Sequence, residues 1–234
     1  MGKGLSKKLI NKSYGSIPHL STSKLNQQAD KKITIGQEEI LTIKARDRHD
    51  VIIVLEKVDG CNTGILKMSG NVYGVTREGY DVRNSPFRHV RLFQEYVDKY
   101  RKRYSSILKE GERICGEWMV KVHSLEYSLP HEPFVAFDIM DTSNKRLIYD
   151  DFKKICDNYE VITTGLVHRD TPITIENAMK KLDNGFHGCL EQPEGIVYRC
   201  ERKGKVDFLA KYVRDKIDGL YMNDESKYNS YPCL

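Results

Sequence analysis

The sequence predicts an α+β domain whose sheets are largely antiparallel. Several short apolar runs rich in β-branched residues have the length of buried strands, for example at 51–55 and 134–140. Only a few stretches show the three- and four-residue spacing of an amphipathic helix. Strands and helices do not alternate in the regular order that predicts a parallel sheet, so an antiparallel arrangement is favoured.

The strand predictions follow the chain in order. Asp50 is followed by VIIVL, a buried strand that runs directly into Glu56. Residues 64–75 hold two apolar runs on either side of a turn around Gly70, which predicts a hairpin. Further strands are expected at 112–120, 134–140, 194–200 and 207–214.

The clearest predicted helix covers 85–109, with Ser85 as its N-cap and Pro86 at its first position. Apolar residues along it form one stripe. Basic side chains cover the rest, and a solvated exterior is favoured over a phosphate-binding face. Shorter helices are predicted at 148–156 and, after Thr174, at 175–182.

Residues 1–32 are polar and basic and are predicted to form an N-terminal arm, followed by one folded domain at 33–223 and a flexible tail at 224–234. The six cysteines lack metal-ligand spacing, so free thiols are expected. With no signal peptide and no apolar run near the ~20 residues of a membrane span, an intracellular protein without a membrane partner is expected. The net charge of +5 is compatible with a polyanionic partner.

Lys57 is a candidate covalent nucleophile. It follows the buried strand and is itself followed by Asp59 and Gly60. A free lysine has a pKa near ~10.4, and burial or neighbouring cations lower it enough to expose the amine lone pair. Asp59 offers a hydrogen-bond acceptor and Gly60 allows close approach of a nucleotide. A simple surface turn is the alternative for this short pattern.

Charged residues recur in the later strands. Glu117 lies in ICGEW, Asp138 follows Phe137 in FVAFDI, Glu194 opens EGIVY and Lys211 lies in FLAKY. A charge within a strand is costly unless it is paired or binds a ligand. The set predicts a pocket for a polyanion and its metal, and a structural network of salt bridges is the alternative.

In order and spacing, EKVDG, GEWM, FVAFDI, EGIVY and FLAKY resemble motifs I, III, IIIa, IV and V of the covalent nucleotidyltransferases. These enzymes are the ATP- and NAD-dependent polynucleotide ligases and the mRNA capping guanylyltransferases. The resemblance spans residues 51–215. It implies the nucleotidyltransferase fold of ligases and capping enzymes for the domain at 33–223.

Details of the sequence are similar to the RNA ligase 2-like group. Asn62 stands where DNA ligases typically carry an arginine, and Arg77 lies 20 residues past Lys57, as in that group. YGSIPHL (14–20) also resembles the lead-in of RNA ligase domains. The alternatives are a DNA ligase, a capping enzyme, an AMPylator of other substrates, or a non-catalytic nucleic-acid-binding module.

The resemblance implies a role for each motif residue. Lys57 would receive AMP from ATP, and Glu56, or the backbone beside it, would read the adenine edge. Glu194 would act at the metal, Mg²⁺ or Mn²⁺, or at the lysine, and Lys211 would neutralise the α-phosphate. The nucleotide would also be contacted by Asp59, Gly60, Asn62, Arg77, Glu117 and Phe137, with Phe137 stacking on the base unless it is a core residue.

The implied reaction transfers AMP from Lys57 to a 5′-phosphate end, which a 3′-hydroxyl then attacks, so RNA and possibly DNA ends are the expected partners. Two departures from the family pattern matter. Leu209 replaces the first lysine of motif V, and only 23 residues follow Lys211. No C-terminal OB-fold is therefore expected, and a partner protein is an expected source of end recognition.

Overall fold

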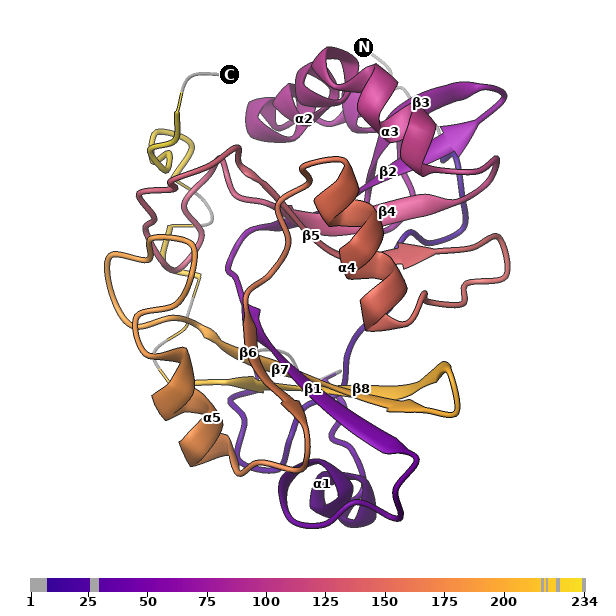
Figure 1. The fold of residues 1–234 in the computed structure, drawn as a ribbon. Helices are drawn as coiled ribbons and strands as arrows, with labels where there is room; N and C mark the ends of the chain where they lie inside the picture. Colours follow the sequence, from indigo (N-terminus) through magenta and orange to yellow (C-terminus); the bar gives the residue numbers. More distant parts are fainter. Residues whose placement is uncertain (1–7, 26–29, 216, 218, 222–223, 233–234) are drawn as a thin grey trace. The chain divides into compact units, whose positions relative to one another are not determined.

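The structure of the protein is a computed structural model, and it describes residues 8–25, 30–215, 217, 219–221 and 224–232. These residues divide between two compact units (Figure 1). Unit 1 comprises the described parts of 1–15, 60–121 and 134–163, and unit 2 those of 16–59, 122–133 and 164–234. Each unit contains one four-stranded sheet.

The sheet of unit 1 is antiparallel throughout and has the order β3-β2-β4-β5. Its strands are β2 (Cys61–Met68), β3 (Asn71–Thr76), β4 (Arg113–Trp118) and β5 (Phe134–Met140). The predicted hairpin is confirmed, because Ser69 and Gly70 adopt φ values of 52° and 73° that turn β2 back into β3.

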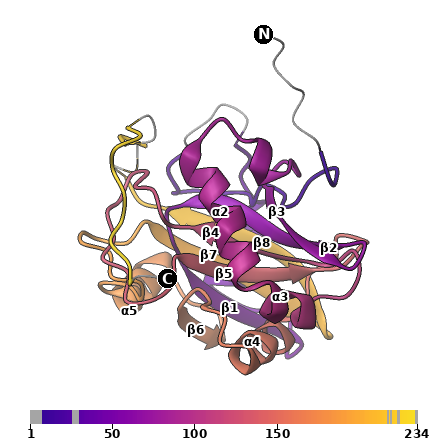
Figure 2. The same cartoon turned by 90° about the horizontal axis from the view of Figure 1, so that it is seen from above.

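Helices α2 (Arg88–Lys99) and α3 (Arg101–Ile107) pack on this sheet, as Figures 1 and 2 show. The ring of Phe93 lies 5.1 Å from that of Trp118 and 5.2 Å from that of Phe134. Helix α4 (Tyr149–Asn158) lies beside β5 and matches the prediction at 148–156.

The prediction of one helix over 85–109 is wrong at its start and in its middle. The short 3₁₀ helix η1 (Val82–Asn84) precedes α2, and the extended Phe87 is the N-cap of α2. Tyr100 then separates α2 from α3. In an unbroken helix, residues eight apart would lie about 12 Å apart along the axis. The break instead brings the buried hydroxyls of Tyr96 and Tyr104 to 2.5 Å.

The sheet of unit 2 is also antiparallel, with the order β6-β1-β7-β8. Its strands are β1 (Asp50–Lys57), β6 (Leu166–Asp170), β7 (Gly195–Arg202) and β8 (Lys205–Val213). Helix α5 (Ile175–Leu182) begins where predicted, and the Thr174 hydroxyl accepts a hydrogen bond from the Asn177 amide at 3.3 Å. Helix α1 (Ile35–Thr42) and the edge strand β6 were not predicted.

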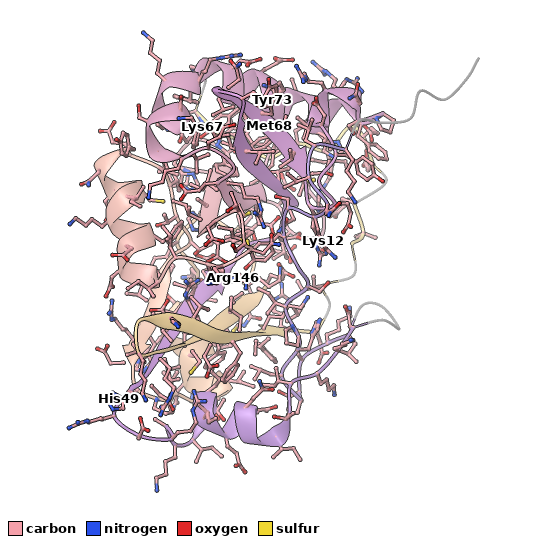
Figure 3. The ribbon with its side chains drawn as sticks, turned by 90° about the vertical axis from the view of Figure 1, so that its right-hand side faces the viewer. Lys12, His49, Lys67, Met68, Tyr73 and Arg146 are labelled. Atoms are coloured by element: carbon pink, nitrogen blue, oxygen red, sulfur yellow. The ribbon has the colours of Figure 1, made fainter. Side chains whose placement is uncertain are left out.

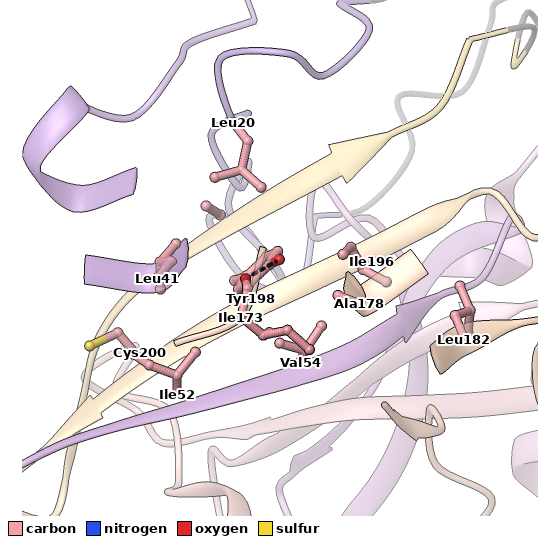
Figure 4. Close-up of a cluster of buried hydrophobic side chains, with 11 residues drawn as sticks. Leu20, Leu41, Ile52, Val54, Ile173, Ala178, Leu182, Ile196, Tyr198 and Cys200 are labelled. Atoms are coloured by element: carbon pink, nitrogen blue, oxygen red, sulfur yellow. Dashed lines mark hydrogen bonds between the residues drawn. The ribbon is translucent and has the colours of Figure 1, made fainter. Parts of the chain in front are cut away.

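Helices α1 and α5 cover the same face of this sheet, where the core of unit 2 lies (Figures 1 and 4). The core joins Leu41 of α1 and Leu182 of α5 to Ile52 and Val54 of β1 and Ile196 of β7. Alternate residues of β1 and β7 therefore face these helices, and the residues between them face the opposite side.

The described part of the predicted arm forms no helix or strand but is not wholly exposed. Tyr14 is buried in unit 1, and His19 and Leu20 are buried in unit 2. The boundaries drawn at 1–32, 33–223 and 224–234 remain predictions.

Five cysteines are free thiols, as predicted, and Cys233 lies outside the described residues. Among the helices of the described residues, none has the length and apolar character needed to cross a membrane.

Candidate active site

Lys57 is the last residue of β1, and the register of β1 with β7 places it opposite Gly195. Glu194, immediately before β7, is therefore brought next to Lys57 across the strand pair. The Lys57 Nζ donates a hydrogen bond to the Glu194 Oε2 at 2.7 Å. The two residues are 137 positions apart in sequence, so strand pairing alone creates this contact.

The Lys57 side chain is 21% exposed, whereas that of Glu194 is 6% exposed. Burial raises the pKa of Glu194 to about 7, against the opposing effect of the Lys57 ammonium. A carboxyl group that titrates near neutrality and contacts an amine is suited to exchange a proton with it.

Lys211 lies on β8 and pairs with Val197 of β7. Because Val197 is two residues from Gly195, Lys211 and Lys57 occupy the same face of the sheet, opposite the α1–α5 core. The strand carrying Lys211 is held by the N-terminal segment, since its amide donates to the Pro18 carbonyl at 2.9 Å. Leu209 faces the same side and is 9% exposed.

Glu56 faces the core side of β1, opposite to Lys57, and is 1% exposed. Its Oε2 accepts a hydrogen bond from the Phe186 amide at 2.8 Å and lies 3.7 Å from the His187 Nε2. A Cβ at Gly185 would lie 2.4 Å from its Oε1. Burial raises the pKa of Glu56 to about 7. The carboxyl group is thus enclosed by the loop between α5 and β7.

Asp59 anchors the segment 122–133 of unit 2. Its Oδ2 accepts hydrogen bonds from the amides of Ser124 at 2.6 Å and Leu125 at 2.9 Å. Its own amide donates to the Tyr127 hydroxyl at 3.1 Å. The Oδ2 therefore has a structural task, which the sequence pattern did not reveal.

In unit 1, Asn62 of β2 lies directly opposite Glu117 of β4. The Asn62 Nδ2 donates to the Glu117 Oε1 at 3.4 Å, and the Asn62 carbonyl accepts from the Arg77 amide at 3.2 Å. A Cβ at Gly60 would lie 3.1 Å from the Trp118 carbonyl oxygen and 3.3 Å from the Glu117 Cβ. The close approach of β4 explains the glycine at this position.

Phe137 occupies an irregular position of β5. The register pairs Cys115 with Asp138 but Gly116 with Ala136, so Phe137 is the extra residue of a β-bulge. Its neighbours on β5 are buried, whereas Phe137 is half-buried. Its ring meets that of Tyr14 edge to face at 4.8 Å. The bulge thus turns an aromatic ring out of the core, which is what base stacking requires.

The predicted site residues therefore form two groups, one in each unit. Unit 2 carries Glu56, Lys57, Asp59, Glu194 and Lys211, and unit 1 carries Gly60, Asn62, Arg77, Glu117 and Phe137. Within them, Lys57 contacts Glu194 and Asn62 contacts Glu117.

Sequence reasoning missed two buried polar clusters. In unit 2, the His187 Nδ1 lies 2.7 Å from the His131 Nε2, on the far side of His187 from Glu56. In unit 1, the Asp138 Oδ2 accepts from the Tyr14 hydroxyl at 2.6 Å and from the Arg146 Nε at 3.1 Å. Asp138 stood out in the sequence as a charge within a strand, but no local pattern identifies its partners or the histidine pair, because the members come from distant segments.

Among the described residues, no three histidine, cysteine or carboxylate side chains gather into a metal-binding group. Mg²⁺ characteristically binds through one or two carboxylates together with phosphate oxygens of the substrate. A single carboxylate such as Glu194 fits that mode of binding, in which the substrate supplies the other oxygen ligands.

The fold of the chain is that of the nucleotidyltransferase domains of polynucleotide ligases. An archaeal ATP-dependent RNA ligase is similar with a TM-score of 0.55 and 16% identity, covering 87% of this chain and 48% of that one. A Naegleria gruberi RNA ligase solved with pyrophosphate is similar with a TM-score of 0.56 and 16% identity, covering 92% of this chain and 60% of that one. A putative ATP-dependent DNA ligase from Aquifex aeolicus is similar with a TM-score of 0.53 and 20% identity, covering 86% of this chain and 49% of that one.

Residues 50–213 match the RNA ligase family, and the chain belongs to that family. The family resemblance and the predicted fold class are thereby confirmed. The chain spans about half of the length of the ligase structures it resembles. Comparison with curated proteins gave no match.

Proposed function

We propose that the protein is an ATP-dependent RNA ligase that forms a covalent lysyl-AMP at Lys57. The observation that carries the proposal is the 2.7 Å contact between the Lys57 Nζ and the Glu194 Oε2, where the end of β1 pairs with the start of β7. The amine attacks the α-phosphorus of ATP, and pyrophosphate leaves. AMP then passes to a 5′-phosphate end, and a 3′-hydroxyl displaces it to form the phosphodiester bond.

Within this proposal, Glu194 removes the proton that Lys57 must lose before it can attack, since its pKa is about 7 and it already contacts the amine. After the carboxyl group has released this proton to solvent, it would be ionised again and could hold a divalent cation that binds the triphosphate. Lys211, on the same sheet face, supplies positive charge to the α-phosphate as negative charge develops. Leu209 adds no charge there, so Lys211 acts alone in motif V.

We further propose that the backbone beside Glu56, rather than its carboxyl group, reads the adenine. Strand alternation turns the Glu56 side chain away from the face that carries Lys57, and the carboxyl group is held by the Phe186 amide. Phe137 stacks on the base, Glu117 holds a ribose hydroxyl, and Arg77 contacts the ribose or phosphates. Gly60, Asn62 and Asp59 shape the start of this nucleotide-binding segment.

Mg²⁺ or Mn²⁺ is the proposed metal, held by Glu194 and phosphate oxygens. A mutant of the Naegleria gruberi RNA ligase has been solved with ATP and Mn, which supports this assignment. Family membership together with Asn62 and Arg77 favours RNA over DNA ends. The proposal includes a role in RNA repair and a partner protein as a source of end recognition.

The test is retention of label on the protein after incubation with α-labelled ATP and Mg²⁺ or Mn²⁺, followed by a denaturing gel. Label is expected with ATP and not with GTP or NAD, and it should disappear in Lys57→Ala. Lys211→Ala should slow labelling strongly, whereas Lys205→Ala, at the exposed start of the same strand, should not. Absence of covalent label from every nucleotide would overturn the proposal.

Joining assays then address the substrate. Nicked RNA, single-stranded RNA and nicked DNA, each with a 5′-phosphate and a 3′-hydroxyl, are compared at equal concentration. Faster sealing of RNA is expected. Equal or faster sealing of nicked DNA would favour the alternative of a DNA ligase, which the similarity to the Aquifex aeolicus protein keeps open.

A further inference from the structure

Unit 1 contains a cavity of about 770 Å³ to which none of the motif residues contributes. The cavity is lined by residues 9–13 and Gly15 of the N-terminal segment, by 66–68 at the end of β2, by Gly111 and Arg113, by Met140 at the end of β5, and by Thr142, Asn144 and Arg146 beyond it. Its volume lies in the range of about 300–1,000 Å³ typical of ligand sites and exceeds the needs of a single small ion.

The cavity lining is strongly basic. Four of its residues carry a positive charge, Lys12, Lys67, Arg113 and Arg146, and none of the lining residues is acidic. Figure 3 labels three of them, each from a different segment of unit 1. This charge is not a local run of sequence, because the fold assembles it from segments up to 134 positions apart, at 12 and 146.

Arg113 shows that part of this charge has no counter-ion among its hydrogen-bond partners. It is 4% exposed. Its guanidinium donates to the carbonyls of Ser13 at 2.7 Å and Asp141 at 3.1 Å and to the Asn144 Oδ1 at 2.5 Å. These acceptors, together with the Met140 Sδ at 3.6 Å from Nη2, are all neutral. A buried cation is costly when only neutral groups surround it, and an anion in the cavity would lower that cost.

Lys67 is arranged in the same way, since its Nζ donates to the neutral Ser105 carbonyl at 2.6 Å. The other two cations have acidic neighbours. The Arg146 Nε lies 3.1 Å from the Asp138 Oδ2, and the Lys12 Nζ lies 3.8 Å from the Glu78 Oε1. Four cations thus stand against two contacting carboxylates, which leaves the cavity with a net positive charge.

One cation of the cavity lining also contacts the aromatic pair of Tyr14 and Phe137, and Phe137 is the ring that we propose for base stacking. The Arg146 guanidinium lies 5.0 Å from the Tyr14 ring centre, and Tyr14 meets Phe137 at 4.8 Å. A basic cavity beside an aromatic pair is the combination with which proteins bind single strands of nucleic acid.

We propose that this cavity, lined by Lys12, Lys67, Arg113 and Arg146, binds the phosphodiester backbone of the RNA substrate. The choice of RNA as the ligand rests on the proposed function. The expectation that the ligand carries phosphate groups rests on the positive charge of the cavity lining. The contacts are to backbone phosphates, so the cavity contributes affinity without preference for base sequence.

The test is binding of a fluorescently labelled single-stranded RNA, followed by anisotropy over a series of salt concentrations. The variants are Lys12→Gln, Lys67→Gln and the double variant. The control is Lys154→Gln, an exposed lysine on α4 of the same unit that does not line the cavity. Lys12 is 47% exposed, so its replacement leaves the packing of unit 1 intact even if Lys67→Gln disturbs it.

Each cavity variant should weaken binding equally for RNAs of different sequence. The slope of log Kd against log salt should fall by roughly 0.7 for each phosphate that the variant no longer neutralises, and Lys154→Gln should match the wild type. Unchanged binding and slope in Lys12→Gln and in the double variant would overturn the proposal.

The same variants separate this proposal from the proposed function. Labelling by ATP should be unchanged in Lys12→Gln and Lys67→Gln, because neither residue belongs to the nucleotide machinery. If the wild type takes no label while the cavity variants still lose RNA binding, the ligase proposal fails and the RNA-binding cavity stands. If labelling is normal and RNA binding is unaffected by the variants, only the cavity proposal fails.

Discussion

At the residue scale, adjacent side chains of β1 have separate tasks because a strand turns them to opposite faces. Lys57 contacts Glu194 on one face, and Glu56 is enclosed with His187 on the other. The pattern E-K-x-D-G is one motif in the sequence, but its residues have different tasks in the fold. Lys57 is the proposed nucleophile, whereas the carboxyl groups of Glu56 and Asp59 anchor neighbouring segments. The position of Lys57 after a buried strand followed from the sequence, whereas the anchoring contacts of Glu56 and Asp59 did not.

Glu56 and His187 affect stability in opposite directions as pH changes. The pKa of Glu56 is raised from 4.5 to about 7, so its contribution to stability is complete below pH 4.5 and is lost as pH rises to about 7. The pKa of His187 is lowered from 6.5 to about 3, mainly by burial and further by His131, so its neutral form favours the fold increasingly as pH rises from about 3 to 6.5. Around Glu56, the nearby titratable groups are His187 and Cys189.

The variant Glu56→Gln isolates the first effect, because the amide oxygen still accepts from the Phe186 amide but does not titrate. Its unfolding free energy relative to wild type should rise by up to about 3 kcal/mol between pH 4.5 and 7, the equivalent of the raised pKa. Denaturant unfolding at several pH values measures this difference. The exposed Glu39→Gln should follow the wild-type curve, and a parallel curve for Glu56→Gln would contradict the raised pKa.

At the element scale, the sequence predicted what is locally encoded. The apolar run before Lys57, the Ser69–Gly70 turn and the Thr174 cap each leave a local signal, and each is found where expected. Helix α1 had such a signal too, since Thr34 and Gln37 form a capping box, but its weak apolar pattern concealed it.

Other features of the elements depend on packing. The edge strand β6 reads LVHRD and gains its strand character by pairing with β1. The break at Tyr100 accompanies the contact between Tyr96 and Tyr104, and the bulge at Phe137 accompanies the pairing of β4 with β5. The spacing of apolar residues along a helix or strand does not identify these contacting residues.

The bulge on β5 depends on Gly116, because a Cβ there would lie 2.5 Å from the Val135 carbonyl oxygen and 2.6 Å from the Phe134 ring. Gly116→Ala should therefore destabilise the protein by about 1–3 kcal/mol in denaturant unfolding. Gly36→Ala is the control: nothing lies within 4 Å of its added Cβ in α1, and it should stabilise by up to about 1 kcal/mol. Wild-type stability in Gly116→Ala would show that β4 and β5 separate without cost.

At the scale of the whole molecule, the sequence predicted one domain at 33–223, and within that range the chain contributes alternating segments to two units. The reason lies in long-range pairing. β1 pairs with β6 and β7, more than a hundred residues later, while its immediate successor β2 joins the other sheet. Motif order along the chain indicated the residue set, but only strand register shows which members share a unit.

This division predicts that nucleotide binding and covalent chemistry respond to different substitutions. Lys57→Ala cannot form lysyl-AMP, yet it should still bind ATP through Phe137 and Glu117 of unit 1. ATP at a hundred times its Kd should then stabilise that variant by about 2.7 kcal/mol.

Adding Phe137→Ala should remove most of the stabilisation by ATP, because stacking on the half-buried ring is lost. Adding Phe87→Ala instead removes an aromatic side chain of unit 1 that is 52% exposed and should leave the stabilisation intact. Thermal unfolding with and without ATP measures all three proteins. Equal stabilisation in the Phe137 and Phe87 double variants would assign Phe137 to the core of unit 1 and remove it from the nucleotide site.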